Sequence, residues 1–204
     1  MTPCTVIFDI DGVVVDSEQL HFDVLCRIAP KETKNVSVES LIGLSMGETL
    51  SQIGVPTERH DEVSAQIGVV YKDTLGTTYL REGIRELVSK LQDRGIPFGF
   101  VSTAPRDICL ANIAVLGLIP EPILVSGDDV AHTKPHPDPY LAMLKILDAQ
   151  PEETVVIEDT DLGIQAATAA GITRVYGWPH ALSNEQNYRQ AFKVIQSLDD
   201  IEDL

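Results

Sequence analysis

The feature that most constrains the fold is a short apolar run that ends in two carboxylates. Residues 6–8 read Val-Ile-Phe, and Asp9, Ile10, Asp11 and Gly12 follow them. An apolar run of this length, with two β-favouring aliphatic side chains and an aromatic one, is typical of a strand buried in a sheet. Open α/β sheets bind ligands at the carboxyl ends of their strands, so we expect Asp9 and Asp11 to lie where a ligand binds.

Two other structures are compatible with this stretch when it is taken alone. The pair Asp11-Gly12 between apolar runs is also a strong signal for a β-hairpin. A calcium-binding loop fits less well, because it would need a helix before it and its glycine later in the loop. The choice between these structures depends on whether matching chemistry follows later in the chain.

Beyond residue 80, short apolar runs alternate with helical patterns. We expect strands at 97–101, 123–125, 154–157 and 173–176, and an edge strand at 194–195. We expect helices at 84–94, 108–116, 138–147, 162–170 and 184–191. Strands that alternate with helices pair in parallel through right-handed crossovers. The pattern therefore predicts an α/β fold with a parallel sheet.

Residues 17–80 follow a different pattern. Apolar positions with helical spacing occur at 19–29 and again between Val63 and Tyr71, and prolines and glycines punctuate the chain between them. We interpret 17–80 as a small helical insertion in the α/β core.

Composition limits the possible partners and compartments. The formal net charge of −16 argues against a nucleic-acid partner, which would need a basic surface. The chain has no apolar run of membrane-spanning length, and its start lacks a basic leader and an apolar signal core, so we expect no membrane partner. Its three cysteines are widely spaced and odd in number, which favours a reducing compartment, and we expect a cytoplasmic protein.

Polar residues follow three of the predicted strands. They are Asp9 and Asp11, then Ser102 and Thr103, then Glu158 and Asp159, and Lys134 lies in the loop after the third strand. Carboxylates on two strand ends can hold a hard cation such as Mg²⁺, which prefers oxygen ligands. A hydroxyl group and a lysine can hold the oxygens of a phosphate, so the set indicates a metal-dependent site for a phosphorylated ligand.

Each of these residues also has a purely structural explanation. Ser102 could cap the helix that follows it, and Lys134 could be a solvated loop residue. Glu158 and Asp159 could interact with the dipole of the next helix. Their order and placement together favour a common site.

At this point the sequence resembles the haloacid dehalogenase superfamily over nearly its whole length. Residues 9–13 (Asp-Ile-Asp-Gly-Val) match the first motif in the Asp-x-Asp form found in its phosphatases, and Ser102 matches the second. Residues 134–138 match the third motif, and residues 157–167 match the fourth. The resemblance implies a Rossmann-like core formed by 1–16 and 81–204, with a helical cap domain at 17–80.

The resemblance also implies a reaction and a role for each site residue. Asp9 would be the nucleophile that forms an aspartyl-phosphate, and Asp11 would first protonate the leaving oxygen and then activate water. Mg²⁺ would bind the carboxylates of Asp9 and Asp159 and the backbone carbonyl of Asp11. Among the remaining motif residues, Glu158 would support the metal ligands, and the phosphoryl group would be held by Ser102, Thr103 and Lys134.

Within the superfamily, the chain is similar to the subgroup of β-phosphoglucomutase and phosphoglycolate phosphatase. Residues 16–21 match its acidic run followed by histidine, and residues 43–46 match its substrate-specificity loop. The candidates for substrate selection are His21, Ser45, Met46 and Glu48, although His21 could equally be an exposed helix residue. The mutase carries an arginine in this loop to hold a second phosphate, where this chain has Met46.

We therefore expect a Mg²⁺-dependent phosphatase that hydrolyses a small phosphate monoester, such as a sugar phosphate. The alternatives are a phosphosugar mutase, which is an isomerase, and a binding protein on a retired enzyme scaffold. The presence of Asp9, Asp11, Lys134 and Asp159 argues against the binding protein.

Overall fold

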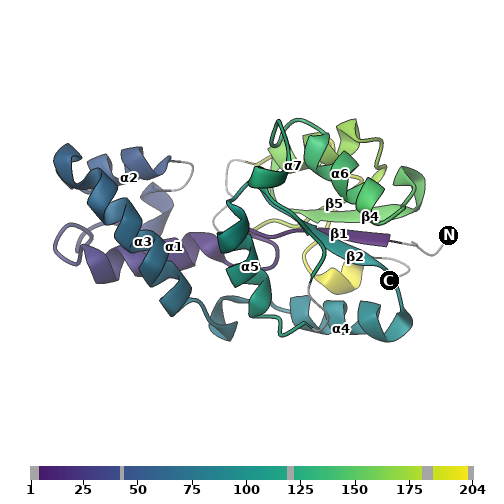
Figure 1. Cartoon of the computed structure of the whole chain (residues 1–204), viewed down its shortest axis with the longest axis horizontal. Helices are drawn as coiled ribbons and strands as arrows, with labels where there is room; N and C mark the ends of the chain where they lie inside the picture. Colours follow the sequence, from purple (N-terminus) through teal and green to yellow (C-terminus); the bar gives the residue numbers. More distant parts are fainter. Residues whose placement is uncertain (1–4, 42–43, 119–121, 181–185, 202–204) are drawn as a thin grey trace. The chain divides into compact units, whose positions relative to one another are not determined.

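The computed structural model describes residues 5–41, 44–118, 122–180 and 186–201 (Figure 1). The chain divides into two compact units. The first, here called the core unit, comprises Met1–Val15 and Leu80–Leu204. The second, here called the inserted unit, is Asp16–Tyr79.

The core unit is built on a six-stranded sheet in the order β3-β2-β1-β4-β5-β6. Its strands are β1 (Thr5–Asp9), β2 (Phe98–Val101), β3 (Leu124–Val125), β4 (Thr154–Glu158), β5 (Arg174–Gly177) and β6 (Lys193–Val194). All neighbouring strands pair in parallel. The α/β, Rossmann-like fold predicted from the sequence is therefore confirmed, and each predicted strand lies close to its expected range.

Strand β1 lies in the middle of this sheet. It pairs with β2 on one side, where Asp9 is opposite Val101, and with β4 on the other, where Phe8 is opposite Ile157. Val6, Ile7 and Phe8 are fully buried, as expected for a strand covered on both faces. The hairpin interpretation of Asp11-Gly12 is wrong, because β1 pairs with distant strands rather than with the chain that follows it.

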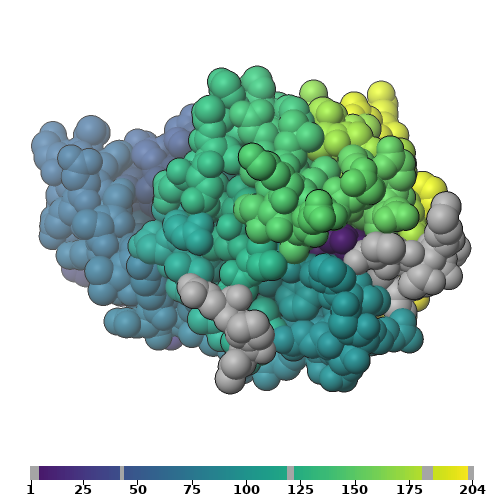
Figure 2. Space-filling model, turned by 45° about the vertical axis from the view of Figure 1, so that its right-hand side comes forward, coloured from purple at the N-terminus to yellow at the C-terminus, as the bar shows by residue number. Residues whose placement is uncertain are grey.

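Helices cover both faces of the sheet. They are α4 (Ile84–Arg94), α5 (Arg106–Ala114), α6 (Asp138–Ile146) and α7 (Asp161–Ala169). Figure 1 shows α6 and α7 on one face and α4 on the other. Side chains of α6 and α7, including Tyr140, Met143 and Ile164, pack in one buried cluster with Ile7 and Val156 of the sheet. On the face in Figure 2, the purple of β1 is visible only as a small patch between later segments.

The α-helices in the described residues of the inserted unit are α1 (Ser17–Ile28), α2 (Met46–Gln52) and α3 (His60–Thr74). Helices α1 and α3 pack together and bury Leu20 and Val24 on one side and Ile67 and Tyr71 on the other. The apolar pattern did not predict α2 as a separate helix. Its signal is the Ser-x-x-Glu capping box that begins at Ser45.

The prediction of a helix at 184–191 is wrong for residues 186–191, the part of this range that the structure describes. Residues 184 and 185 lie outside the described residues, and 186–191 are not helical. Tyr188 has a positive φ of 53°. Its backbone N–H donates to Asp161 Oδ1 at 2.8 Å, and its hydroxyl donates to the backbone oxygen of Asp159 at 2.8 Å. These tertiary hydrogen bonds override the local helical pattern.

A search of the described residues for a helix both long and apolar enough to cross a membrane finds none.

Candidate active site

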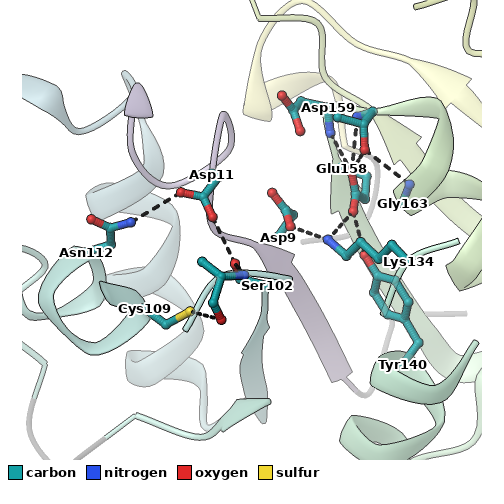
Figure 3. A network of polar contacts seen from close by, with 12 residues as sticks. Asp9, Asp11, Ser102, Cys109, Asn112, Lys134, Tyr140, Glu158, Asp159 and Gly163 are labelled. Carbon is teal, nitrogen blue, oxygen red and sulfur yellow. Dashed lines mark hydrogen bonds and ion pairs between the residues drawn. The ribbon is translucent and has the colours of Figure 1, made fainter. Parts of the chain in front are cut away.

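Carboxylates from two neighbouring strands meet at one edge of the sheet. Asp9 ends β1, Glu158 ends β4, and Asp159 follows it (Figure 3). The three side chains are buried, and each places a carboxylate oxygen within 4.8 Å of the other two. The structure therefore brings together the acidic residues that the sequence placed at two strand ends.

Lys134 supplies positive charge inside this cluster. It lies between β3 and α6, and its side chain is only 7% exposed. Its Nζ forms ion pairs with Asp9 Oδ1 and, at 2.6 Å, with Glu158 Oε1. Lys134 is therefore not a solvated loop residue, which was the structural alternative for it.

Glu158 is fixed by contacts to both of its carboxylate oxygens. Oε1 accepts hydrogen bonds from Lys134 and, at 2.8 Å, from the hydroxyl of Tyr140. Oε2 accepts from the backbone N–H groups of Asp159 and Thr160 and from Thr160 Oγ1, at 3.0–3.1 Å. A Cβ at position 163 would overlap this carboxylate, so only glycine fits there. Glu158 has little capacity left to bind a further ligand directly.

Asp159 is different, because its Oδ1 is the one buried side-chain oxygen or nitrogen in the described part of the chain that has no hydrogen-bond partner. A buried carboxylate oxygen without a partner is costly unless a cation or donor compensates it. The cluster contains three carboxylates, whose oxygens are hard donors, and one lysine to balance their charge. These residues fit a divalent cation of the kind that oxygen ligands bind.

The electrostatics of the cluster support this conclusion. Burial raises the pKa of Asp9 well above its usual value, and the carboxylates of Glu158, Asp159 and Asp11 add to this, while Lys134 offsets part of it. Burial and the Glu158 carboxylate likewise raise the pKa of Asp159. Burial tends to lower the pKa of Lys134, but Asp9 and Glu158 outweigh it and hold that pKa above its usual value. Further positive charge would keep both aspartates ionised.

Asp11 lies beside this cluster with both oxygens hydrogen-bonded. Ser102 Oγ donates to Asp11 Oδ2 at 2.9 Å, and Asn112 Nδ2 donates to Asp11 Oδ1 at 3.3 Å. Ser102 Oγ also accepts from the backbone N–H of Ala104 at 3.0 Å. Helix α5 has Pro105 as its N-cap and no side-chain cap, so the alternative that Ser102 caps this helix is wrong. The turn continues through Gly12, whose φ is +79°, and a Cβ there would overlap the carboxylate of Asp159.

Three residues that contact the site segments were not found from the sequence, among them Arg81, whose Nη1 donates to the backbone oxygen of Gly12. Asn112 is fully buried on α5 beside Cys109 and Ile113, and a polar residue on a buried helix face was the available signal for it. Tyr140 and Arg81 had no distinctive local pattern. Thr103, by contrast, was a candidate for phosphate binding but is exposed, and among the described residues no hydrogen bond joins it to the cluster.

Comparison with known proteins identifies the family. The profile of the haloacid dehalogenase-like hydrolases matches residues 6–176. The chain belongs to this family. It is a hydrolase of the haloacid dehalogenase type, as the resemblance of its motifs implied.

Named relatives of this hydrolase are phosphatases. It is 32% identical to a phosphorylated carbohydrates phosphatase from Thermotoga maritima, over 93% of this chain and 91% of the relative. It is 30% identical to the pyrophosphatase PpaX from Bacillus mycoides, over 98% of this chain and 94% of the relative. Among solved structures, it resembles a HAD family hydrolase from Deinococcus radiodurans R1 with bound phosphate and sodium. That match has a TM-score of 0.76 and 27% identity, and it covers 96% of this chain and 92% of the other.

The predicted selection residues of this hydrolase fall into two groups within the inserted unit. His21 and Met46 line one cavity of about 180 Å³. The other lining residues are Glu18, Phe22, Leu25, Val38, Leu41, Leu44 and Thr49. Ser45 and Glu48 instead form the capping box of α2, in which Ser45 N–H and Oγ donate to Glu48 Oε2 at 2.8 and 2.6 Å. Gly43, the first residue of the predicted loop, lies outside the described residues.

Proposed function

We propose that this hydrolase is a Mg²⁺-dependent phosphatase that acts on a small phosphate monoester, such as a sugar phosphate, through an aspartyl-phosphate on Asp9. The observation that carries the proposal is the buried cluster in which Asp9 is paired with Lys134 and lies beside the unpartnered oxygen of Asp159. The phosphatases among its relatives support the reaction class.

In the first proposed step, a carboxylate oxygen of Asp9 attacks phosphorus and the bond from phosphorus to the leaving oxygen breaks. Asp11 gives its proton to that oxygen, so the product leaves as an alcohol. In the second step, Asp11 takes a proton from water as the water attacks the phosphorus of the aspartyl-phosphate. Inorganic phosphate leaves, Asp9 is regenerated and Asp11 is protonated again. A carboxylate nucleophile thus divides hydrolysis into two easier steps.

Two positive groups would assist Asp9. Lys134 pairs with it directly, and this position also suits contact with the oxygens of the phosphoryl group. Mg²⁺, when bound, would neutralise charge on the phosphoryl group and keep the buried aspartates ionised. The residues that would hold it are the carboxylates of Asp9 and Asp159 and the backbone carbonyl of Asp11. The saturated hydrogen bonding of Glu158 suits a supporting role rather than direct ligation.

Asp11 would need to change partners during the cycle. Both of its oxygens accept hydrogen bonds from neutral donors, and in the water step this carboxylate would instead accept a proton from water. To act first as an acid, Asp11 must carry a proton on one of its carboxylate oxygens. The hydrogen bond that this oxygen accepts from Ser102 or Asn112 must then break. We propose that the Ser102 hydroxyl turns from Asp11 to a phosphoryl oxygen when substrate binds.

We further propose that the inserted unit acts as the cap of this enzyme and selects the substrate. Its cavity is lined mostly by apolar side chains, and the described lining residues include no lysine or arginine. Such a cavity suits an uncharged leaving group better than a second phosphate. Met46 lines this cavity where the mutase has an arginine. Together with the named phosphatase relatives, this makes the mutase alternative the less favoured one.

The proposal is tested by phosphate release from a panel of phosphate esters that includes sugar phosphates and pyrophosphate. We expect sustained release from at least one monoester, loss of release after chelation, and recovery with added Mg²⁺. Asp159→Ala should raise the Mg²⁺ concentration required by at least about tenfold. The matched control is Asp93→Ala, which removes an exposed aspartate on α4. Full activity after exhaustive chelation would exclude the metal, and interconversion of isomers without net release would favour the mutase.

A further inference from the structure

Arg81 makes an unusual set of contacts close to the metal-binding cluster. Its Nη1 donates to the backbone oxygens of Gly12, at 2.6 Å, and of Trp178, at 3.2 Å. Its Nη2 donates to the backbone oxygen of Pro179 at 3.0 Å. The guanidinium carbon lies 3.5 Å from the centre of the Trp178 ring. One side chain thus joins two segments that are far apart in the sequence.

Both segments are directly connected to metal-site residues. Gly12 follows Asp11, and the lack of room for a Cβ at Gly12 means that this turn lies directly against the Asp159 carboxylate. Trp178 donates its backbone N–H to the backbone oxygen of Glu158 at 2.7 Å, immediately before Asp159. Arg81 therefore links the turn that carries Asp11 to the strand end that carries Glu158 and Asp159.

The chemistry of these contacts requires arginine. A guanidinium has several N–H donors in one plane, so it can bond to carbonyls of two segments while its face stacks on an aromatic ring. A lysine ammonium would keep the charge but lacks this planar geometry. The charge itself also reaches the site, since Arg81 is one of the groups that oppose the raised pKa of Asp159.

We propose that Arg81 is a positioning residue for the metal site, which holds the Asp11-Gly12 turn against Asp159 so that the oxygen ligands of both segments are at the separation that Mg²⁺ needs. Mg²⁺ tolerates little departure from octahedral geometry, so a small shift of one ligand segment weakens binding. The inference rests on the proposed Mg²⁺ site. It assigns no contact between Arg81 and substrate.

The test is Mg²⁺ binding by isothermal titration calorimetry, without substrate, on the full chain and its Arg81→Lys variant. We expect the Mg²⁺ dissociation constant of Arg81→Lys to rise by about tenfold, as for other residues that support metal ligands. The control is Arg85→Lys, four residues later in the chain, because Arg85 Nη2 also donates to a backbone oxygen, that of Val115, at 2.7 Å. Thermal unfolding of each metal-free variant measures any general loss of stability.

The outcomes separate the possibilities. Weaker Mg²⁺ binding in Arg81→Lys, with wild-type affinity in Arg85→Lys, supports positioning by Arg81. Wild-type affinity in Arg81→Lys, or the same loss in both variants, overturns it. If Arg81→Lys does not fold, Trp178→Leu removes the ring on which the guanidinium rests, and wild-type affinity in that variant also overturns the inference. A wild-type chain that binds no Mg²⁺ would contradict the proposed metal site itself, and the role of Arg81 with it.

Discussion

In the proposed function, the acidic cluster of the core unit and the cavity of the inserted unit would specify their ligands in opposite ways. In the cluster, Glu158 has both oxygens engaged, Asp9 is paired with Lys134, and the unpartnered oxygen of Asp159 is an exception that a cation would satisfy. In the cavity, the lining is mostly apolar, and Met46 and its neighbours define a shape rather than a set of bonds. Substitutions in the charged cluster should therefore abolish most of the activity. Substitutions in the cavity should change the preference among substrates by smaller factors.

The largest effect expected from this comparison is at Asp9. Asp9→Asn keeps the size of the side chain but replaces the nucleophilic carboxylate by a poor nucleophile, so kcat should fall by at least about 10⁴-fold. Steady-state phosphate release measures it, and circular dichroism checks that the variant remains folded. A folded Asp9→Asn enzyme with a rate near that of the wild type would remove Asp9 from the proposed role.

A smaller effect concerns pH and the metal. The raised pKa values of Asp9 and Asp159 mean that the folded chain without metal holds protons that the unfolded chain releases. This contribution to stability is fully present below the pKa of an aspartate in the unfolded chain, about 4. It is lost as the pH rises through the raised pKa values of the folded chain. The Tm of the metal-free protein should therefore fall with rising pH, and the increase in Tm caused by Mg²⁺ should grow.

Calorimetry between about pH 5 and pH 8 checks this, with Asp159→Asn as the comparison. That variant lacks one of the two titrating carboxylates, so its metal-free Tm should depend less on pH than that of the wild type. An equal or steeper decrease in the variant would contradict the assigned electrostatics.

The smallest effect is expected in the inserted unit. Met46→Ala enlarges the cavity and Met46→Arg adds a cation, so each should change the ratio of kcat/KM between two phosphate esters by about tenfold. Hydrolysis of acetyl phosphate, which has a small leaving group, should change little. Val69→Ala is the control, because Val69 is 64% exposed on α3. An unchanged ranking of substrates in both Met46 variants would exclude the cavity as the selecting element.

Features that follow from a local sequence pattern could be predicted, whereas features that depend on tertiary packing could not. The strands could be predicted from their apolar runs. Asp9, Asp11, Ser102, Lys134 and Asp159 could be proposed as site residues because each lies at or just after a predicted strand or in a recognisable motif. Asn112, Tyr140 and Arg81 were missed, because their contacts in the site depend on the packing of α5, α6 and the segment before α4. The absence of a helix at 186–191 could not be foreseen either, since it depends on hydrogen bonds from Asn187 and Tyr188 to Asp161.

The proposed phosphorylation of Asp9 can be tested directly by locating the phosphoryl group. Asp11→Asn should slow the water step, so the enzyme should accumulate the aspartyl-phosphate when it is mixed with Mg²⁺ and acetyl phosphate, whose acetate leaves without the proton that Asp11 would give to an alcohol. Borohydride reduces an acyl phosphate to an alcohol, which mass spectrometry of the peptides then assigns to one residue. We expect a reduced residue at position 9, absent without substrate. Modification at another carboxylate instead, or turnover in Asp11→Asn without any trapped intermediate, would contradict it.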